Sequence, residues 1–184
     1  SYSNTSYHNE ELKSLTRYRF DKVQERAKLK TSISRLVCIL FPELEKLVPT
    51  LHMASVYALL SEFPSAHAIA SVHLTRLTNL LSESSKGRYG KDTAITFRDS
   101  ARASIGSNMP AKSLELKHTI KLIKELDSEI DEIENFIDRA IILKNGEIAA
   151  DVRMDALRQE NKSLQSLMKE VTGYKEGNLE ELLS

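Results

Sequence analysis

Two long stretches of the chain carry the apolar periodicity of α-helices. Over residues 113–143, apolar residues recur at spacings of three and four for about four heptads, and Thr119 fills one position of the pattern. This seam predicts a coiled-coil helix. The helix would be about 45 Å long, so it needs a second long helix to cover its seam. The seam residues are Leu116, Ile123, Leu126, Ile130, Ile133, Ile137 and Ala140.

A second helix is predicted over residues 9–41, where apolar residues again recur at helical spacings. Asn9 is its expected N-cap, and it should end before Pro42 because the residue ahead of a proline is pushed out of the helical conformation. This stretch is basic, whereas residues 125–138 are acidic. We therefore expect an antiparallel pair of long helices, 9–41 against 111–144.

Between these helices, residues 42–110 have a different character, with shorter apolar segments, three more prolines and glycine-containing turns. Helices are predicted over 50–62, from an N-cap at Ser65, over 75–82 and over 92–105. The sequence thus predicts an all-α fold, in which a small helical subdomain is inserted at one end of the helical pair.

The two ends of the chain carry weaker signals. Residues 1–8 are polar without a period and predict a disordered N-terminus. After a stop signal at Asn145-Gly146, residues 145–184 contain a new seam and predict a zipper-like helix and a tail. Asn161 in an interior position resembles the residue that fixes register in parallel dimers, so we expect a homodimer or higher homo-oligomer. The expected oligomerisation residues are Ile123, Ile130, Ile137, Asn161 and Leu164.

Composition supports the helical reading and adds a charge asymmetry. The chain of 184 residues is 41% hydrophobic but only 6% aromatic, with no Trp, which is typical of long helices. The net charge is zero. Residues 1–112 hold 16 Lys and Arg against 10 Asp and Glu, and residues 113–184 hold 10 against 16. The two parts, at +6 and −6, should attract each other.

The cellular compartment follows from what the sequence lacks. Cys38 is the single cysteine, so no disulfide can form within the chain, and its apolar neighbours predict a buried side chain. No window approaches the length of a membrane span, and residues 1–8 do not have the pattern of a signal peptide. We expect a soluble, cytoplasmic protein without a membrane partner.

Catalytic constellations are not found in the sequence. Glu115 and His118 have the spacing of the ligands in di-metal helical bundles, but such sites need two such motifs and this chain has one. The acids of residues 129–134 would radiate from a rod rather than converge on a cavity, as a two-metal centre requires. No serine, histidine and acid can be grouped into a triad. We therefore assign no catalytic residue and no metal ligand.

The best binding candidate is the turn at residues 86–91 (KGRYGK), which has two glycines, three cations and an aromatic residue. Glycines let the backbone approach an anion, and its N–H groups can line up on a phosphate. Two arginines, four apart on the following helix, could extend this track, although a solvated turn and arginines paired with acids would look the same. The candidate nucleic-acid-binding residues are Lys86, Arg88, Tyr89, Lys91, Arg98 and Arg102.

Five motifs occur in a particular order and spacing: NEELKSLTRYRF at 9–20, FPEL at 41–44, EFPSA at 62–66, SKGRYG at 85–90 and SIG at 104–106. In this order they resemble the middle of the DEDD-type insertion-sequence transposases, also known as bridge-RNA-guided recombinases. The resemblance covers about residues 9–140. Each motif alone would be weak evidence.

Members of that family carry a RuvC-like domain with an Asp-Glu-Asp-Asp metal site, then a helical coiled-coil region, then a domain with a nucleophilic serine. The resemblance falls on the coiled-coil region, and residues 145–184 do not resemble the opening of the serine domain. It implies an assembly and nucleic-acid-binding region that acts in DNA transposition and binds DNA or guide RNA. Any catalysis, and the divalent metal expected to be Mg, would belong to family domains outside this stretch.

The sequence leaves two alternative functions open. A structural coiled-coil scaffold or adaptor would need no nucleic acid, and it differs from a nucleic-acid binder in showing no salt-dependent affinity for phosphates. An enzyme complete in itself ranks last, because the sequence shows no catalytic constellation.

Overall fold

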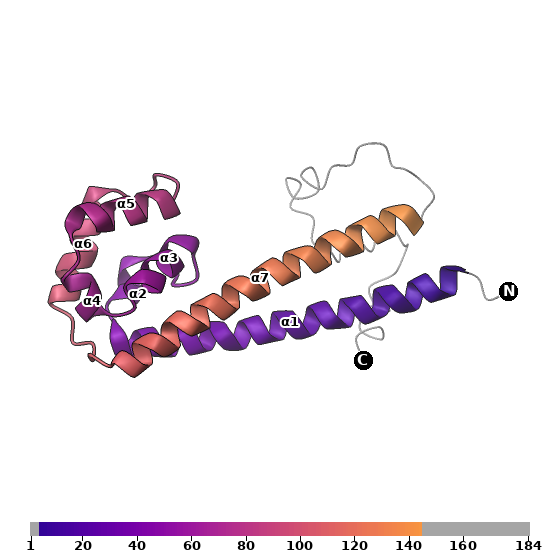
Figure 1. Cartoon of the computed structure of the whole chain (residues 1–184), viewed down its shortest axis with the longest axis horizontal. Helices are drawn as coiled ribbons and strands as arrows, with labels where there is room; N and C mark the ends of the chain where they lie inside the picture. Colours follow the sequence, from indigo (N-terminus) through magenta and orange to yellow (C-terminus); the bar gives the residue numbers. More distant parts are fainter. Residues whose placement is uncertain (1–3, 145–184) are drawn as a thin grey trace. The chain divides into compact units, whose positions relative to one another are not determined.

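The computed structural model describes residues 4–144 of the chain. These residues contain α-helices and no β-strand, so the predicted all-α class is confirmed for this part of the chain (Figure 1). The helices are α1 (Asn4–Leu40), α2 (Leu44–Leu47), α3 (Ala54–Glu62), α4 (Ala66–Ala70), α5 (Leu74–Ser84), α6 (Lys91–Arg102) and α7 (Pro110–Lys144).

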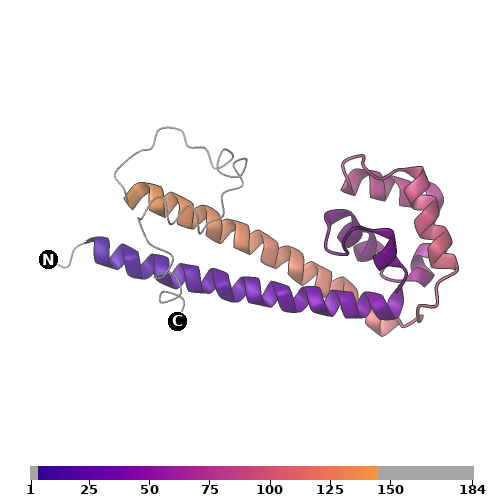
Figure 2. The same ribbon diagram turned by 180° about the vertical axis from the view of Figure 1, so that it is seen from behind.

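The chain divides into two compact units, and both contain a length of α1 and a length of α7 (Figures 1 and 2). The core unit is Arg26–Glu125, which includes α2 to α6. The two-helix unit consists of Ser1–Glu25 and Leu126–Ser184, of which the structure describes residues 4–25 and 126–144.

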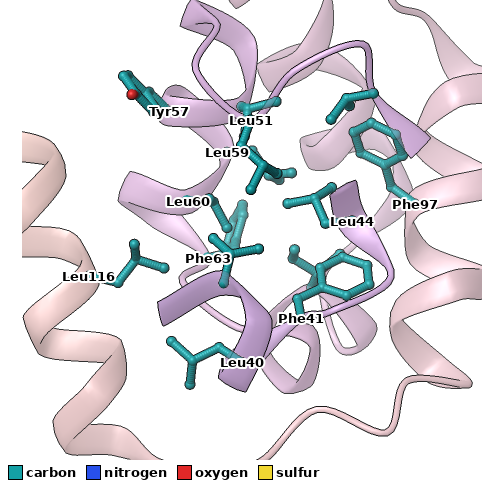
Figure 3. Close-up of a cluster of buried hydrophobic side chains, with 14 of the residues drawn as sticks. Leu40, Phe41, Leu44, Leu51, Tyr57, Leu59, Leu60, Phe63, Phe97 and Leu116 are labelled. Atoms are coloured by element: carbon teal, nitrogen blue, oxygen red, sulfur yellow. The ribbon is translucent and has the colours of Figure 1, made fainter. Parts of the chain in front are cut away.

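The core unit is built around one hydrophobic cluster. The end of α1, the helices α2 to α6 and the beginning of α7 all contribute buried side chains to it. Helix α6 packs against α4 and α5, and α5 packs against α3. In Figure 3, Phe41, Leu44 and Phe97 lie close together within the cluster, and all three are almost completely buried. Burial of each such side chain stabilises the fold by about 1.5–3 kcal/mol.

Helix boundaries in the core unit follow local chemistry. Helix α1 ends at Leu40, ahead of Phe41-Pro42, which confirms the expected stop. The Ser65 Oγ accepts a hydrogen bond of 3.1 Å from the Ala68 N–H, so Ser65 is the N-cap of α4, as predicted.

Glu43 holds together two segments that are about sixty residues apart in sequence. Its carboxylate accepts hydrogen bonds from the Ser104 hydroxyl at 2.5 Å and from the Ile105 N–H at 2.9 Å. We call these three residues the Glu43 clasp. Burial raises the pKa of Glu43, but the hydrogen bonds from Ser104 and Ile105 outweigh it, so the pKa lies below the ordinary value of 4.5. The clasp fixes the loop that leads into α7.

The same loop makes a close backbone contact with the end of α1. A Cβ atom at Gly106 would lie 2.4 Å from the Leu40 carbonyl oxygen, so only glycine fits this position. The next N–H, of Ser107, donates a 2.8 Å hydrogen bond to the Ile39 carbonyl. The loop therefore satisfies one of the carbonyl groups left without a partner at the end of a helix.

In the two-helix unit, a short apolar cluster and two ion pairs join the helices. Ile133, Ile137 and Ile141 of α7 pack with Leu12 and Leu15 of α1. Arg19 pairs with Glu134 at 2.7 Å, and Lys22 pairs with Glu129 at 2.5 Å. Each ion pair joins a residue of α1 to a residue of α7 within this unit.

Several predicted boundaries need correction. Helix α1 begins at Asn4 rather than Asn9, because residues 4–8 contain no Gly or Pro and adding a turn to a helix needs no new nucleus. The helix predicted over 50–62 begins at Ala54, and residues 44–47 form the additional short helix α2. The helix predicted over 92–105 ends at Arg102, since Ser104 and Ile105 bind Glu43. The predicted zipper over 145–184 lies outside the described residues.

Candidate nucleic-acid interface

The basic turn between α5 and α6 has a fixed backbone. Lys86 and Gly87 have positive φ values of 54° and 82°, which reverse the chain after α5. The Ser85 Oγ accepts a 2.8 Å hydrogen bond from the Tyr89 N–H, and the Gly87 N–H donates to the Ser82 carbonyl at 2.8 Å. These bonds fix the backbone from which the cations of the turn project.

The same bonds correct one part of the prediction. The N–H groups of Lys86, Gly87, Arg88 and Tyr89 all donate to oxygen atoms of residues 82–85. These N–H groups already make hydrogen bonds within the turn, which stabilise the chain reversal. They therefore do not line up on a phosphate. What the turn offers a partner is its side chains: Lys86, Arg88 and Lys91 are exposed.

Tyr89 belongs to the core and not to the binding surface. Its ring meets Phe97 edge-on, with centroids 6.3 Å apart, and its hydroxyl lies 3.9 Å from the Met53 sulfur. The side chain is half-buried against the hydrophobic cluster. The prediction that Tyr89 contacts nucleic acid is therefore wrong in one respect. The ring cannot stack on a base, because Phe97 and the hydrophobic cluster already cover it. Tyr89 positions the turn instead.

The two arginines of α6 differ from each other. Arg102 is exposed, and its Nε donates a 3.2 Å hydrogen bond to the carbonyl of Ala70, the last residue of α4. Arg98 is half-buried, and its Nε is buried without a hydrogen-bond partner among the described residues. Within residues 4–144 neither arginine pairs with an acid. Arg102 can extend the cationic surface, while Arg98 is largely covered.

The surroundings of the turn are positively charged. The core unit contains 15 Lys and Arg against 8 Asp and Glu, a net charge of +7. In the described part of the chain, Lys86, Arg88 and Lys91 form no salt bridge, so their charges are not locally compensated. An uncompensated positive field of this kind attracts phosphates and raises the rate of encounter with them.

Three of the predicted oligomerisation residues lie inside the chain. Ile123, Ile130 and Ile137 are at most 2% exposed, because neighbours in the same chain cover the seam of α7. Assigning them to a contact with a second copy was therefore wrong in this arrangement. Asn161 and Leu164 lie outside the described residues. The exposed apolar side chains of α7 in the core unit are Leu114 and Leu122, at 54% and 57%.

The structure corrects the prediction for Cys38 and shows the hydrogen-bonding partners of His52. Cys38 is exposed rather than buried, because Val37 and Leu40 face the core and Cys38 lies on the opposite side of α1. His52 lies between the Tyr57 hydroxyl, 2.7 Å from its Nδ1, and the Ser34 hydroxyl, 3.3 Å from its Nε2. Burial and, to a smaller extent, the positive charge of Lys30 lower the pKa of His52 below 6.5.

No metal or membrane feature emerges in residues 4–144. These residues hold no group of three or more His, Cys, Asp and Glu able to bind a metal ion. Glu115 instead forms a 3.1 Å ion pair with Lys112 on the same exposed face. None of the described helices is both long enough and apolar enough to cross a bilayer.

No protein-family model, curated protein or solved structure matches the chain. The structure does bring two of the five sequence motifs into contact, since FPEL at 41–44 supplies Glu43 and SIG at 104–106 supplies Ser104 and Ile105 of the clasp. Two more motifs help to build the core unit. Phe63 of EFPSA and Tyr89 of SKGRYG both pack in its hydrophobic cluster.

Proposed function

We propose that this chain is an assembly and nucleic-acid-binding region acting in DNA transposition or recombination, and that its core unit carries the binding surface. The observation that supports binding is the turn with exposed, unpaired Lys86, Arg88 and Lys91, to which Arg102 adds a fourth cation. A backbone anchored by Ser85 and Tyr89 presents these side chains at little cost in chain ordering.

The chemistry of this surface favours contacts with phosphates rather than bases. Its exposed groups are ammonium and guanidinium, and Tyr89, the aromatic residue of the turn, is packed against Phe97. Contacts with phosphates position a nucleic acid without reading its sequence. We therefore expect DNA and RNA to bind with similar affinity. The stretch has no catalytic role in this proposal.

The test is the combined variant Lys86→Ala, Arg88→Ala and Lys91→Ala in the full chain. Fluorescence anisotropy with labelled DNA and RNA duplexes, over a range of salt, should show weaker binding. The slope of log affinity against log salt should fall by up to about three. The matched control is Lys28→Ala, Arg35→Ala and Lys46→Ala, which removes three exposed cations elsewhere in the same unit.

Three outcomes are informative. An effect confined to the turn variant supports the proposal, provided that helicity and sedimentation are unchanged. An unchanged slope moves the contact to other cations of the chain. Complete absence of binding at low salt favours the structural scaffold.

For assembly, we propose that α1 and α7 form an antiparallel coiled coil and that the chain is a homodimer. The ion pairs Arg19–Glu134 and Lys22–Glu129 support the coiled coil. Leu114 and Leu122, about two helical turns apart on α7, offer exposed apolar side chains for the dimer contact. Sedimentation of Leu114→Glu with Leu122→Glu should show a monomer. A wild-type monomer at tens of micromolar, or a dimer unaffected by this variant, would exclude that interface.

A further inference from the structure

The two-helix unit has an open groove between its helices, with a volume of about 660 Å³. Its apolar floor is formed by Leu15 and by two aromatic side chains, Tyr18 of α1 and Phe136 of α7, which are 50% and 56% exposed. Glu10, Glu11 and Ser14 complete the lining. Exposed aromatic residues that adjoin one another in a groove mark a contact surface more often than isolated ones do.

This groove adjoins the small apolar cluster of the unit, because Leu15 belongs to both. The cluster of Ile133, Ile137 and Ile141 with Leu12 and Leu15 is the local core of the unit, and two helices alone bury little apolar area. A third helix on the side of Tyr18 and Phe136 would complete a three-helix bundle, in which each helix buries one apolar face.

The chain itself continues from a suitable place. Phe136 lies eight residues before Lys144, about 12 Å along α7, and the six residues 145–150 can span about 20 Å, enough to reverse direction. Residues 152–171 then carry a seam at helical spacings. Its members are Met154, Leu157, Asn161, Leu164, Met168 and Val171.

One polar residue of this segment also suits the groove. Asn161 within the seam needs a hydrogen-bond partner when buried, and the groove contains the hydroxyl of Ser14.

We propose that residues 152–171 dock as a third helix in this groove of their own chain, with the seam against Tyr18 and Phe136. The proposal reassigns the Asn161 seam from a second copy to the two-helix unit, and it is independent of nucleic-acid binding. A charged residue in the seam or on the groove floor should release the segment, because it would place an unpaired charge against apolar side chains.

A single tryptophan can report on the groove, because the chain contains no Trp. In the Phe136→Trp variant of the 184-residue chain, docking should give a blue-shifted emission that is independent of protein concentration. Adding Leu157→Glu and Leu164→Glu should shift the emission to that of an exposed indole. The matched control, Gln159→Glu with Ser166→Glu, has the same seven-residue spacing on the opposite side of the segment and should leave the emission unchanged.

Hydrogen exchange tests the same contact without the tryptophan. Phe136→Glu should speed exchange of residues 152–171 by about tenfold or more, whereas Phe20→Glu, at an exposed aromatic of α1 outside the groove, should not. Emission of an exposed indole in the starting chain, or exchange that Phe136→Glu does not change, would overturn the proposal. A blue shift that appears only as concentration rises would overturn it in favour of a second copy.

Discussion

The core unit and the two-helix unit share the same two long helices but are stabilised in different ways. In the core unit, α1 and α7 also pack against α2 to α6, and one large apolar cluster covers both seams. In the two-helix unit, a few aliphatic side chains and two ion pairs join the helices, and the rings of Tyr18, Phe20 and Phe136 stay exposed. An amphipathic seam is thus only as stable as the elements that cover it.

The units also differ in charge, which bears on what each can bind. The core unit has a net charge of +7, whereas the described residues of the two-helix unit hold 6 Lys and Arg against 10 Asp and Glu, a net charge of −4. The zero net charge of the chain conceals this division. A polyanion should therefore be attracted to the core unit and repelled by the two-helix unit.

The largest expected effect compares two phenylalanines. Phe97→Ala in the core unit should lower the free energy of unfolding by about 3–5 kcal/mol, because it leaves a cavity among buried side chains. Phe136→Ala should cost much less, since that ring is 56% exposed. Denaturant unfolding followed by circular dichroism measures both. Equal losses would contradict the contrast between the units.

A smaller effect is expected from the loop that leads into α7. Gly106→Ala should destabilise the chain by about 1–3 kcal/mol, because its Cβ would overlap the Leu40 carbonyl and force the backbone apart. Gly90→Ala is the control, since a Cβ there meets no atom within 4 Å and the change costs only part of an N-cap preference, about 0.5 kcal/mol. Similar losses at the two glycines would show that the close approach to α1 does not matter.

The Glu43 clasp predicts a pH dependence in the core unit. Because folding lowers the pKa of Glu43, its contribution to stability is present above the unfolded value of about 4.5 and is lost as pH falls through the folded pKa. Unfolding measured from pH 7 to 3 should show a steeper loss for the wild type than for Glu43→Gln. Parallel curves would mean that other carboxylates dominate the acid response.

The smallest effect is expected at an ion pair of the two-helix unit. A double-mutant cycle on Arg19→Ala and Glu134→Ala should give a coupling of about 0–1 kcal/mol that shrinks in high salt, because both side chains are about 30% exposed. A coupling of several kcal/mol would show that charge pairs, rather than apolar burial, stabilise this unit.

Local patterns were enough to predict several features of the fold. The spacing of apolar residues predicted both long helices, Pro42 predicted the end of α1, and Ser65 predicted the start of α4. These features depend on residues within a few positions of one another, where backbone conformation and capping act directly. The cations of the turn were likewise visible as binding candidates, since three cations and two glycines occur within residues 86–91.

Other features were decided by residues far apart in the chain. Periodicity marked Ile123, Ile130 and Ile137 as a seam but could not say that the same chain covers it. The sequence predicted Tyr89 as part of a binding turn, whereas in the structure it packs against Phe97 and Met53. No local sequence pattern predicts the hydrogen bond between Glu43 and Ser104. Segments about sixty residues apart can form such a bond only when the core brings them together.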